Sequence, residues 1–173
     1  MIFAQNLQAM KKMNLLLLLL AISVYSCNRD DDNDNGTPTG TGKFEFVGNG
    51  TLYQLNTNVQ MHENATTAGN VLNVAATNTT MAAVGGIDNY TGPRTYDFSE
   101  DNSNYIAFSM SGRTYYLTGG NALAPASHGV LTVTAETTTG NFRNTKGTFS
   151  GVAYASATDS MVITNGVFID SDF

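Results

Sequence analysis

Three acidic residues near the middle of the chain are the side chains best spaced for chemistry. Asp97, Glu100 and Asp101 lie within five residues of one another. Two carboxylates that face each other across a cleft can hydrolyse a glycosidic bond, and carboxylates gathered in a loop can bind calcium. Adjacent acids in a loop are usually solvated or cation-bound, so this cluster is a candidate cation loop. We expect no cofactor other than calcium in this loop, and hydrolysis is the alternative.

The chain has two histidines, His62 and His128, and a catalytic triad or a histidine metal site would need at least one of them. Ser127 precedes His128, but neighbours in sequence rarely face each other as nucleophile and base. The sequence contains no G-x-S-x-G motif, no Walker loop and no dinucleotide fingerprint. We therefore expect both histidines at the surface, no catalytic residue, no defined metal site and a protein that is not an enzyme.

Tyrosines offer a different kind of site. A row of tyrosines on one face of a sheet can stack against sugars or peptides, and the candidate ligand face comprises Tyr96, Tyr105, Tyr115 and Tyr116. The chain contains no tryptophan, which weakens a sugar-binding interpretation. The alternative is that most of these rings belong to the core or form cross-strand pairs.

The only cysteine, Cys27, follows a segment typical of an export signal. After a pair of lysines, Leu15–Tyr25 is an uncharged, mostly apolar run of 11 residues. A membrane-spanning helix needs about 20 apolar residues, so this run fits the apolar part of a signal peptide. Translation starts at Met1 or, as the Met-Lys-Lys sequence there indicates, at Met10.

Val24-Tyr25-Ser26-Cys27 resembles a lipobox, in which a small residue precedes the cysteine that is acylated. We expect residues 1–26 to be a lipoprotein signal peptide, cleaved between Ser26 and Cys27. The resemblance to bacterial lipoproteins implies two or three fatty-acid chains on the cysteine. Each buried CH₂ contributes about 0.8 kcal/mol, so several chains hold a protein on a bilayer while its body stays in water. The alternatives are a plain secretory signal followed by an unused thiol, or a short membrane anchor.

The charge and cysteine content limit the partners of the chain. Cleavage would leave residues 27–173, which carry six basic and 14 acidic side chains and a net charge of −8. An acidic surface argues against nucleic acid and against charge-driven binding to an anionic membrane. A single cysteine can form no disulfide within the chain, so stability must come from packing.

Residues 27–42 are expected to form a disordered acidic tether. The segment NRDDDNDNGTPTGTG contains no apolar side chain that could join a core. Asp31–Gly36 fits the opening of a calcium loop, but Gly42 occupies the position of the bidentate Glu that such a loop needs. An acidic run after a lipidated cysteine also resembles the export signal of Bacteroidetes lipoproteins, which implies display on the outer face of the outer membrane.

Residues 43–173 show the alternation of apolar and polar side chains that predicts half-buried strands in one domain. No window shows a helical stripe. The predicted strands are Lys43–Gly48, Thr51–His62, Val71–Ala76, Met81–Ile87, Arg94–Ser99, Tyr105–Ser111, Thr114–Thr118, Gly129–Glu136, Gly147–Ser156 and Met161–Ile169. About ten short strands predict an all-β domain, either an antiparallel β-sandwich or a partly closed barrel.

Turn residues support these boundaries. Asn49-Gly50 is the preferred pair for a two-residue hairpin, because both central residues need a positive φ. Thr91-Gly92-Pro93 predicts a turn, and Gly119-Gly120 and Asn144–Gly147 predict loops. Asn165-Gly166 is either a last hairpin or a bulge inside one long strand.

Several segments, in order, resemble small Bacteroidetes lipoproteins that share a domain of unknown function. They include KFEFVGNGTLY at 43–53, the 86–96 segment around Thr91-Gly92-Pro93, GVLTVT at 129–134, KGTFSG at 146–151 and ITNGVF at 163–168. Asn89 and Arg94 depart from the pattern. The resemblance implies an antiparallel β-sandwich on a lipid tether and implies no activity.

These features predict a lipid-anchored protein of the outer membrane or cell surface with a non-enzymatic binding or structural role. Its partners would be the membrane, through the anchor, and a glycan or protein ligand. An alternative is a glycan- or peptide-binding accessory module for nutrient capture. A hydrolase that uses the acids at 97–101 or His128 is a third interpretation.

Overall fold

The computed structural model describes residues 42–66, 69–99, 103–119 and 127–173. The expected signal peptide, Cys27, nearly all of the tether, Glu100 and Asp101 lie outside these residues. Within the described part of the chain, no helix is long and apolar enough to cross a membrane.

The described residues form an antiparallel sheet of eleven strands, which confirms the expected all-β fold. The strands are β1 (Lys43–Gly48), β2 (Thr51–Gln54), β3 (Thr57–Thr66), β4 (Gly69–Thr77), β5 (Met81–Ile87), β6 (Thr95–Asp97), β7 (Tyr105–Met110), β8 (Arg113–Thr118), β9 (His128–Thr139), β10 (Phe142–Ser156) and β11 (Asp159–Ile169).

One predicted strand, Thr51–His62, is divided into β2 and β3. The chain leaves β2 at Leu55 and Asn56, and both residues stay tied to β1. Leu55 N donates to Phe44 O at 2.8 Å, and Asn56 Oδ1 accepts from Phe44 N at 3.3 Å. The chain then enters a different part of the sheet, so a continuous run of strand-forming residues contains a corner that alternation alone does not reveal.

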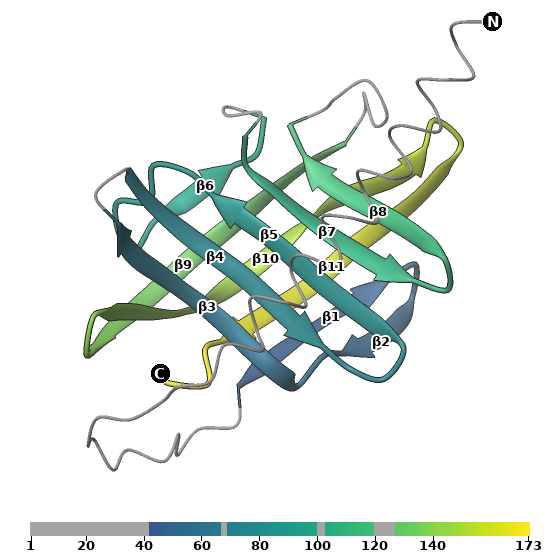
Figure 1. Cartoon of the computed structure of the whole chain (residues 1–173). Coiled ribbons are helices and arrows are strands. Elements are labelled where there is room, and N and C mark those ends of the chain that lie inside the picture. The colour runs from purple at the N-terminus through teal and green to yellow at the C-terminus, as the bar shows by residue number, and fades with distance from the viewer. Residues whose placement is uncertain (1–41, 67–68, 100–102, 120–126) are drawn as a thin grey trace, which may run out of the picture. The chain divides into compact units, whose positions relative to one another are not determined.

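The strand pairing closes on itself through β10. Strands β3, β4, β5, β7 and β8 are hydrogen-bonded in that order, and β10 pairs with β3 near its start and with β8 near its end. The other long partners of β10 are β11 and β9, which extend the sheet to β1 and β2 and to β6. In Figure 1, β3, β4, β5, β7 and β8 lie in front, and β9, β10 and β11 run across them behind.

The core lies between these two groups of strands and is rich in phenylalanine. Phe44 and Phe46 of β1 are fully buried, and they contact Phe149 of β10 and Phe108 of β7 with ring centroids 4.9 and 5.0 Å apart, respectively. Alternate residues of β1 face the core, as the sequence pattern predicts. Burial of large apolar side chains of this kind is the main stabilising term in a chain without disulfides.

Of three turn predictions, one is confirmed, one that was open between a hairpin and a bulge is a bulge, and one is wrong. Asn49 and Gly50 have φ of 48° and 82° and join β1 to β2 as a two-residue hairpin. Asn165 has φ of 53° and lies in a bulge of β11, where two residues face one residue of each neighbouring strand. Asn144–Gly147, expected as a loop, lies inside β10, where Asn144 and Thr145 are buried and paired with β3 and β9.

Candidate functional site

The four tyrosines of the expected ligand face do not share one face. Tyr96 of β6 is 3% exposed, and its ring stacks on Tyr90 with centroids 5.6 Å apart. Its hydroxyl donates to Gly92 O at 2.7 Å and accepts from Thr91 N at 3.0 Å. Tyr96 therefore fixes the turn at residues 91–93 from inside the domain and is not available to a ligand.

Tyr115 also points away from the expected face. It lies opposite Phe108 in the β7–β8 register, packs against the core and donates its hydroxyl to Asp159 Oδ1 at 3.1 Å. Tyr116 follows Tyr115 directly and therefore faces outward, because successive side chains of a strand alternate. Tyr105, which is 40% exposed, lies on the same outer side of β7.

The strand register brings Tyr116 next to a residue that the sequence does not single out, Tyr154. Tyr116 of β8 is paired with Tyr154 of β10. Val152 precedes Tyr154 on the same outer side of β10 and is paired with Val162 of β11. Pairing across strands places these side chains about 5 Å apart at Cβ, so they form a continuous surface.

The same surface continues across β1 to the edge strand β2. Val47 of β1 is paired with Leu52 of β2 on one side and with Thr164 of β11 on the other, which makes Val162 its diagonal neighbour. We call this surface the outer apolar band; its members are Leu52, Val47, Val162, Val152, Tyr154 and Tyr116. Leu52 and Val162 are 60% and 48% exposed, so the band presents large apolar side chains to solvent.

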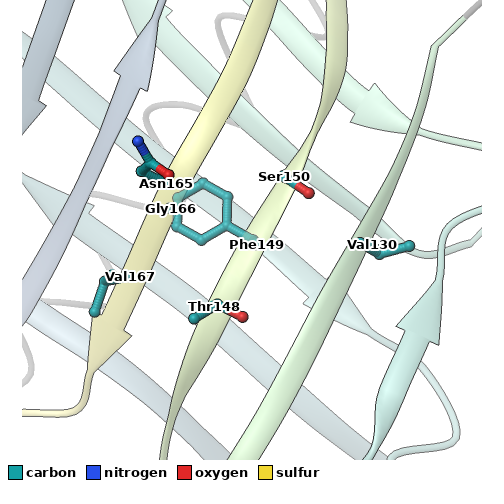
Figure 2. A pocket seen from close by; sticks show the side chains of 7 residues that line it. All are labelled: Val130, Thr148, Phe149, Ser150, Asn165, Gly166 and Val167. Carbon is teal, nitrogen blue, oxygen red and sulfur yellow. The ribbon is translucent and has the colours of Figure 1, made fainter.

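An open depression of about 360 Å³ lies beside this band, over the bulge of β11. Figure 2 shows Thr148, Ser150 and Asn165 at the depression between Val130 and Val167. The remaining lining residues are Phe149 and Gly166, and a Cβ at Gly166 would be only 2.7 Å from the Phe149 ring. The depression therefore combines hydroxyl and amide groups with aliphatic walls and contains no formal charge.

The candidate cation loop is represented by Asp97 alone, because Glu100 and Asp101 lie outside the described residues. Asp97 Oδ1 accepts hydrogen bonds from Ser99 Oγ at 2.6 Å and Ser99 N at 2.8 Å. These bonds lower the pKa of the Asp97 carboxyl. Among the described residues, no group of three histidine, cysteine or acidic side chains is placed to hold a metal ion.

The two histidines lie in different environments. His128, the first residue of β9, is exposed. His62 does not match the expected surface position, because its side chain is 18% exposed and its Nδ1 lies 3.7 Å from Asp170 Oδ2. Its ring also contacts the edge of Phe142, with centroids 4.9 Å apart. His62 therefore belongs to the packing between β3, β10 and the end of β11.

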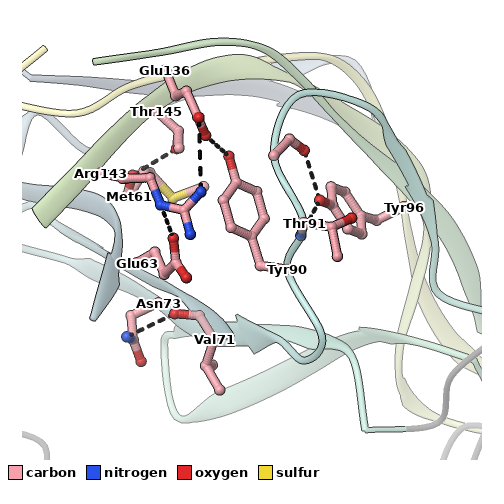
Figure 3. A network of polar contacts seen from close by, with 11 residues as sticks. Met61, Glu63, Val71, Asn73, Tyr90, Thr91, Tyr96, Glu136, Arg143 and Thr145 are labelled. Atoms are coloured by element: carbon pink, nitrogen blue, oxygen red, sulfur yellow. Dashed lines mark hydrogen bonds and ion pairs between the residues drawn. The ribbon is translucent and has the colours of Figure 1, made fainter. Parts of the chain in front are cut away.

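A network of charged residues inside the domain was not foreseen from the sequence (Figure 3). Arg143 of β10 pairs through Nε with Glu63 Oε2, and its Nη1 lies 3.9 Å from Glu136 Oε1. Glu136 Oε2 accepts the hydroxyl hydrogen bond of Tyr90 at 2.9 Å. Glu63 and Tyr90 are 1% and 0% exposed, whereas the Arg143 and Glu136 side chains remain partly open to solvent.

This network leaves one carboxylate incompletely satisfied. Glu63 has an ion pair with Arg143, but neither of its oxygens receives a hydrogen bond of normal geometry from the described residues. Burial and the bond to Glu136 raise the pKa of the Tyr90 phenol. Arg143 thus supplies the charge that allows an acidic side chain to point into the domain.

Comparison with known proteins gives no match to this chain among family models, curated proteins or solved structures.

Proposed function

We propose that this chain is a lipid-anchored protein of the bacterial outer membrane, displayed at the cell surface, with a non-enzymatic binding or structural role. The observation that carries the proposal is the position of Cys27. It follows an apolar run too short to span a bilayer, and the first strand, β1, begins 16 residues later at Lys43. An acylated sulfur, a segment of 15 residues and then a folded domain is the arrangement of a tethered protein.

The energy of acylation supports a lasting attachment. One fatty-acid chain gives only marginal membrane binding, because each buried CH₂ contributes about 0.8 kcal/mol and immobilisation opposes it. The two or three chains of a bacterial lipoprotein would hold the acidic domain at the bilayer without attraction between charges.

Metabolic labelling with an alkyne analogue of palmitate tests the anchor. The native chain should take up the label and enter the detergent phase in Triton X-114 partitioning, whereas Cys27→Ala should do neither. Cys27→Ser, which preserves the size of the side chain, should show the same loss, because it also lacks the sulfur. Labelling of Cys27→Ala at the native level would contradict the proposal.

Surface display is tested separately with protease applied to intact cells. We propose that the acidic run after Cys27 directs export to the outer leaflet. Replacement of the four aspartates in this run (Asp30, Asp31, Asp32 and Asp34) by serine should leave palmitate labelling intact and make the protein resistant to external protease. Equal digestion of both proteins would show that these aspartates do not direct export.

The second candidate function is an accessory module that captures a glycan or a peptide. The observation that favours it is the uncharged depression over the β11 bulge, with its hydroxyl and amide groups between valines. A glycan and peptide array probed with residues 27–173 tests this role. Binding should be weakened by Thr148→Val and Ser150→Ala, which remove hydroxyl groups and keep the strand.

We also propose that the chain belongs with the small Bacteroidetes surface lipoproteins that its motifs resemble, and that, of the two expected architectures, its strands form the partly closed barrel and not the β-sandwich. The pairing of β10 with both β3 and β8 supports this description of the fold.

A further inference from the structure

We propose that the outer apolar band is the face with which the tethered domain rests on the bilayer that holds its anchor. The proposed occupant is the interface between hydrocarbon and headgroups of that bilayer, and a zwitterionic phospholipid bilayer is the probe that tests it. The inference depends on the proposed acylation of Cys27, and it adds an orientation of the domain that the anchor alone does not impose.

The side chains of the band suit a membrane interface. Leu52 and Val162 are among the most exposed large apolar side chains of the described residues, and they lie on neighbouring parts of one face. A joined group of exposed apolar side chains marks an interaction surface. Tyr116 and Tyr154 continue the band, and tyrosine is enriched where the hydrocarbon meets the headgroups.

The surroundings of the band can leave water without stripping a charge of its hydration. Three segments that supply the band and its margins contain no charged residue, namely 46–54, 147–156 and 160–169. Charges begin only at the edges, with Glu45 on one side and the ion pair between Arg113 and Asp159 on the other. An unpaired charge is costly to desolvate, so a bilayer can cover this face with a small desolvation penalty.

The net charge decides which lipid isolates the apolar contact in a test. Residues 27–173 carry a charge of −8, which opposes contact with an anionic surface. A zwitterionic surface lacks that repulsion, so the expected contact is apolar and interfacial.

The length of chain before β1 makes a weak contact sufficient. Fifteen residues separate Cys27 from Lys43, and such a segment spans at most about 50 Å. Val47 lies four residues into β1, about 13 Å from Lys43 along the strand. The anchor therefore holds the band within reach of the bilayer, so that docking becomes an intramolecular step that needs little intrinsic affinity.

The same face could instead meet a soluble glycan, but two observations favour the bilayer. The most exposed members, Leu52 and Val162, are aliphatic, whereas sugar rings stack best on aromatic faces. The tether also presents the band to the bilayer continuously, whereas a glycan must be captured from solution.

The chain is suited to a direct test, because it has one cysteine and no tryptophan. Residues 27–173, which include every described residue, are coupled through the Cys27 thiol to a maleimide lipid in phosphatidylcholine vesicles. Single tryptophans are introduced as Leu52→Trp or Val162→Trp in the band. Asn73→Trp on β4, in the other group of strands, is the matched control. Circular dichroism verifies that each variant is folded.

Docking should shift the tryptophan emission of the Leu52→Trp and Val162→Trp proteins to the blue, and brominated phosphatidylcholine should quench it. The emission of the Asn73→Trp protein should change in neither respect. Adding Leu52→Glu to the Val162→Trp protein should abolish its quenching. Anionic lipid should reduce quenching at low salt, and added salt should restore it, because screening removes the repulsion. Uncoupled protein should show no quenching, since its intrinsic affinity is low.

Equal quenching at all three positions, or none at Leu52→Trp and Val162→Trp in the coupled protein, would overturn the inference. A change in the emission of the band reporters on addition of a soluble glycan or peptide, with no change on coupling to vesicles, would overturn the inference as well. That result would favour the capture module. Chemical coupling keeps this test independent of acylation in cells. Docking in the vesicle experiment without palmitate labelling in cells would contradict only the proposed anchor. Palmitate labelling in cells without docking on vesicles would contradict only this inference.

Discussion

The side chain of Asp170 accepts a hydrogen bond from the main-chain amide of Met61, 109 residues earlier in the chain. Asp170 follows the last residue of β11, at the point where β10 exchanges its partner β11 for β3. Its own amide donates to Thr145 O, and Thr145 Oγ1 donates to Met61 O at 2.6 Å. Asp170 and Thr145 therefore satisfy backbone groups that lose their ladder partners at this corner.

Removal of this carboxylate should destabilise the domain strongly. Asp170→Ala leaves the buried Met61 amide without its acceptor, and we expect the free energy of unfolding to fall by about 2–4 kcal/mol. Urea unfolding followed by circular dichroism measures the change. Asp172→Ala removes the same charge two residues later and should change stability by no more than about 0.5 kcal/mol. Similar losses in both variants would mean that charge, and not the corner, is responsible.

Removing one partner of the Arg143–Glu63 ion pair should lower the free energy of unfolding more than replacing both partners by apolar residues. Arg143→Met leaves the buried Glu63 without a counter-charge, and we expect a loss of about 3–5 kcal/mol in unfolding free energy. The double variant Glu63→Met/Arg143→Met removes both charges and should recover most of that loss. Arg94→Met, at a guanidinium 4.6 Å from the Tyr96 ring, is the control and should cost about 0.5–1 kcal/mol. A double variant no more stable than Arg143→Met would refute this explanation of the network.

The buried phenol of Tyr90 should make the domain sensitive to high pH. Burial and the bond to Glu136 raise its pKa above the ordinary value of 10.0, so the folded domain keeps the phenol neutral while the unfolded chain ionises. The contribution of Tyr90 is fully present below pH 10 and is lost as the pH rises above it, because only the unfolded state then releases the proton. Urea unfolding should show the native protein losing about 1 kcal/mol more than Tyr90→Phe between pH 9 and pH 11. Parallel pH profiles would mean that Tyr90 titrates equally in both states.

Alternation and turn chemistry made most of the fold predictable from the sequence. Met81–Ile87 was predicted to the residue, and Asn49-Gly50 adopts the positive φ values that its hairpin needs. Both depend on local rules, the period of two and the tolerance of Asn and Gly for left-handed backbone. The closure of the sheet through β10 depends instead on pairs far apart in the sequence, such as Tyr154 with Tyr116, and no local pattern predicts them.

The candidate sites were less predictable for the same reason. The sequence placed Tyr115 and Tyr116 on one face, although alternation alone should have separated them, and missed Tyr154, which only the register brings to Tyr116. The sequence does not predict the charged network, because Glu63 and Glu136 have the acidic side chains that are expected at solvent-facing positions. Strand residues with acidic side chains usually face water, and only the position of Arg143 opposite Glu63 makes an inward carboxylate tolerable.

The segment mistaken for a loop supplies a last prediction, at Gly147. Gly147 lies inside β10, at a point where β9 passes close to it. An added Cβ would be 1.9 Å from Thr132 O and 2.7 Å from Phe168 Cζ. The main chain of Thr132 cannot yield as a flexible side chain could, so Gly147→Ala should lower the free energy of unfolding by about 3 kcal/mol or more. Gly86→Ala is the matched control, because it lies in strand β5 with ordinary contacts of 3.5 Å to Val71, and it should stay within about 0.5 kcal/mol of the native protein. Thermal and urea unfolding of the two variants decide between a glycine required by close strand approach and a glycine that is there by chance.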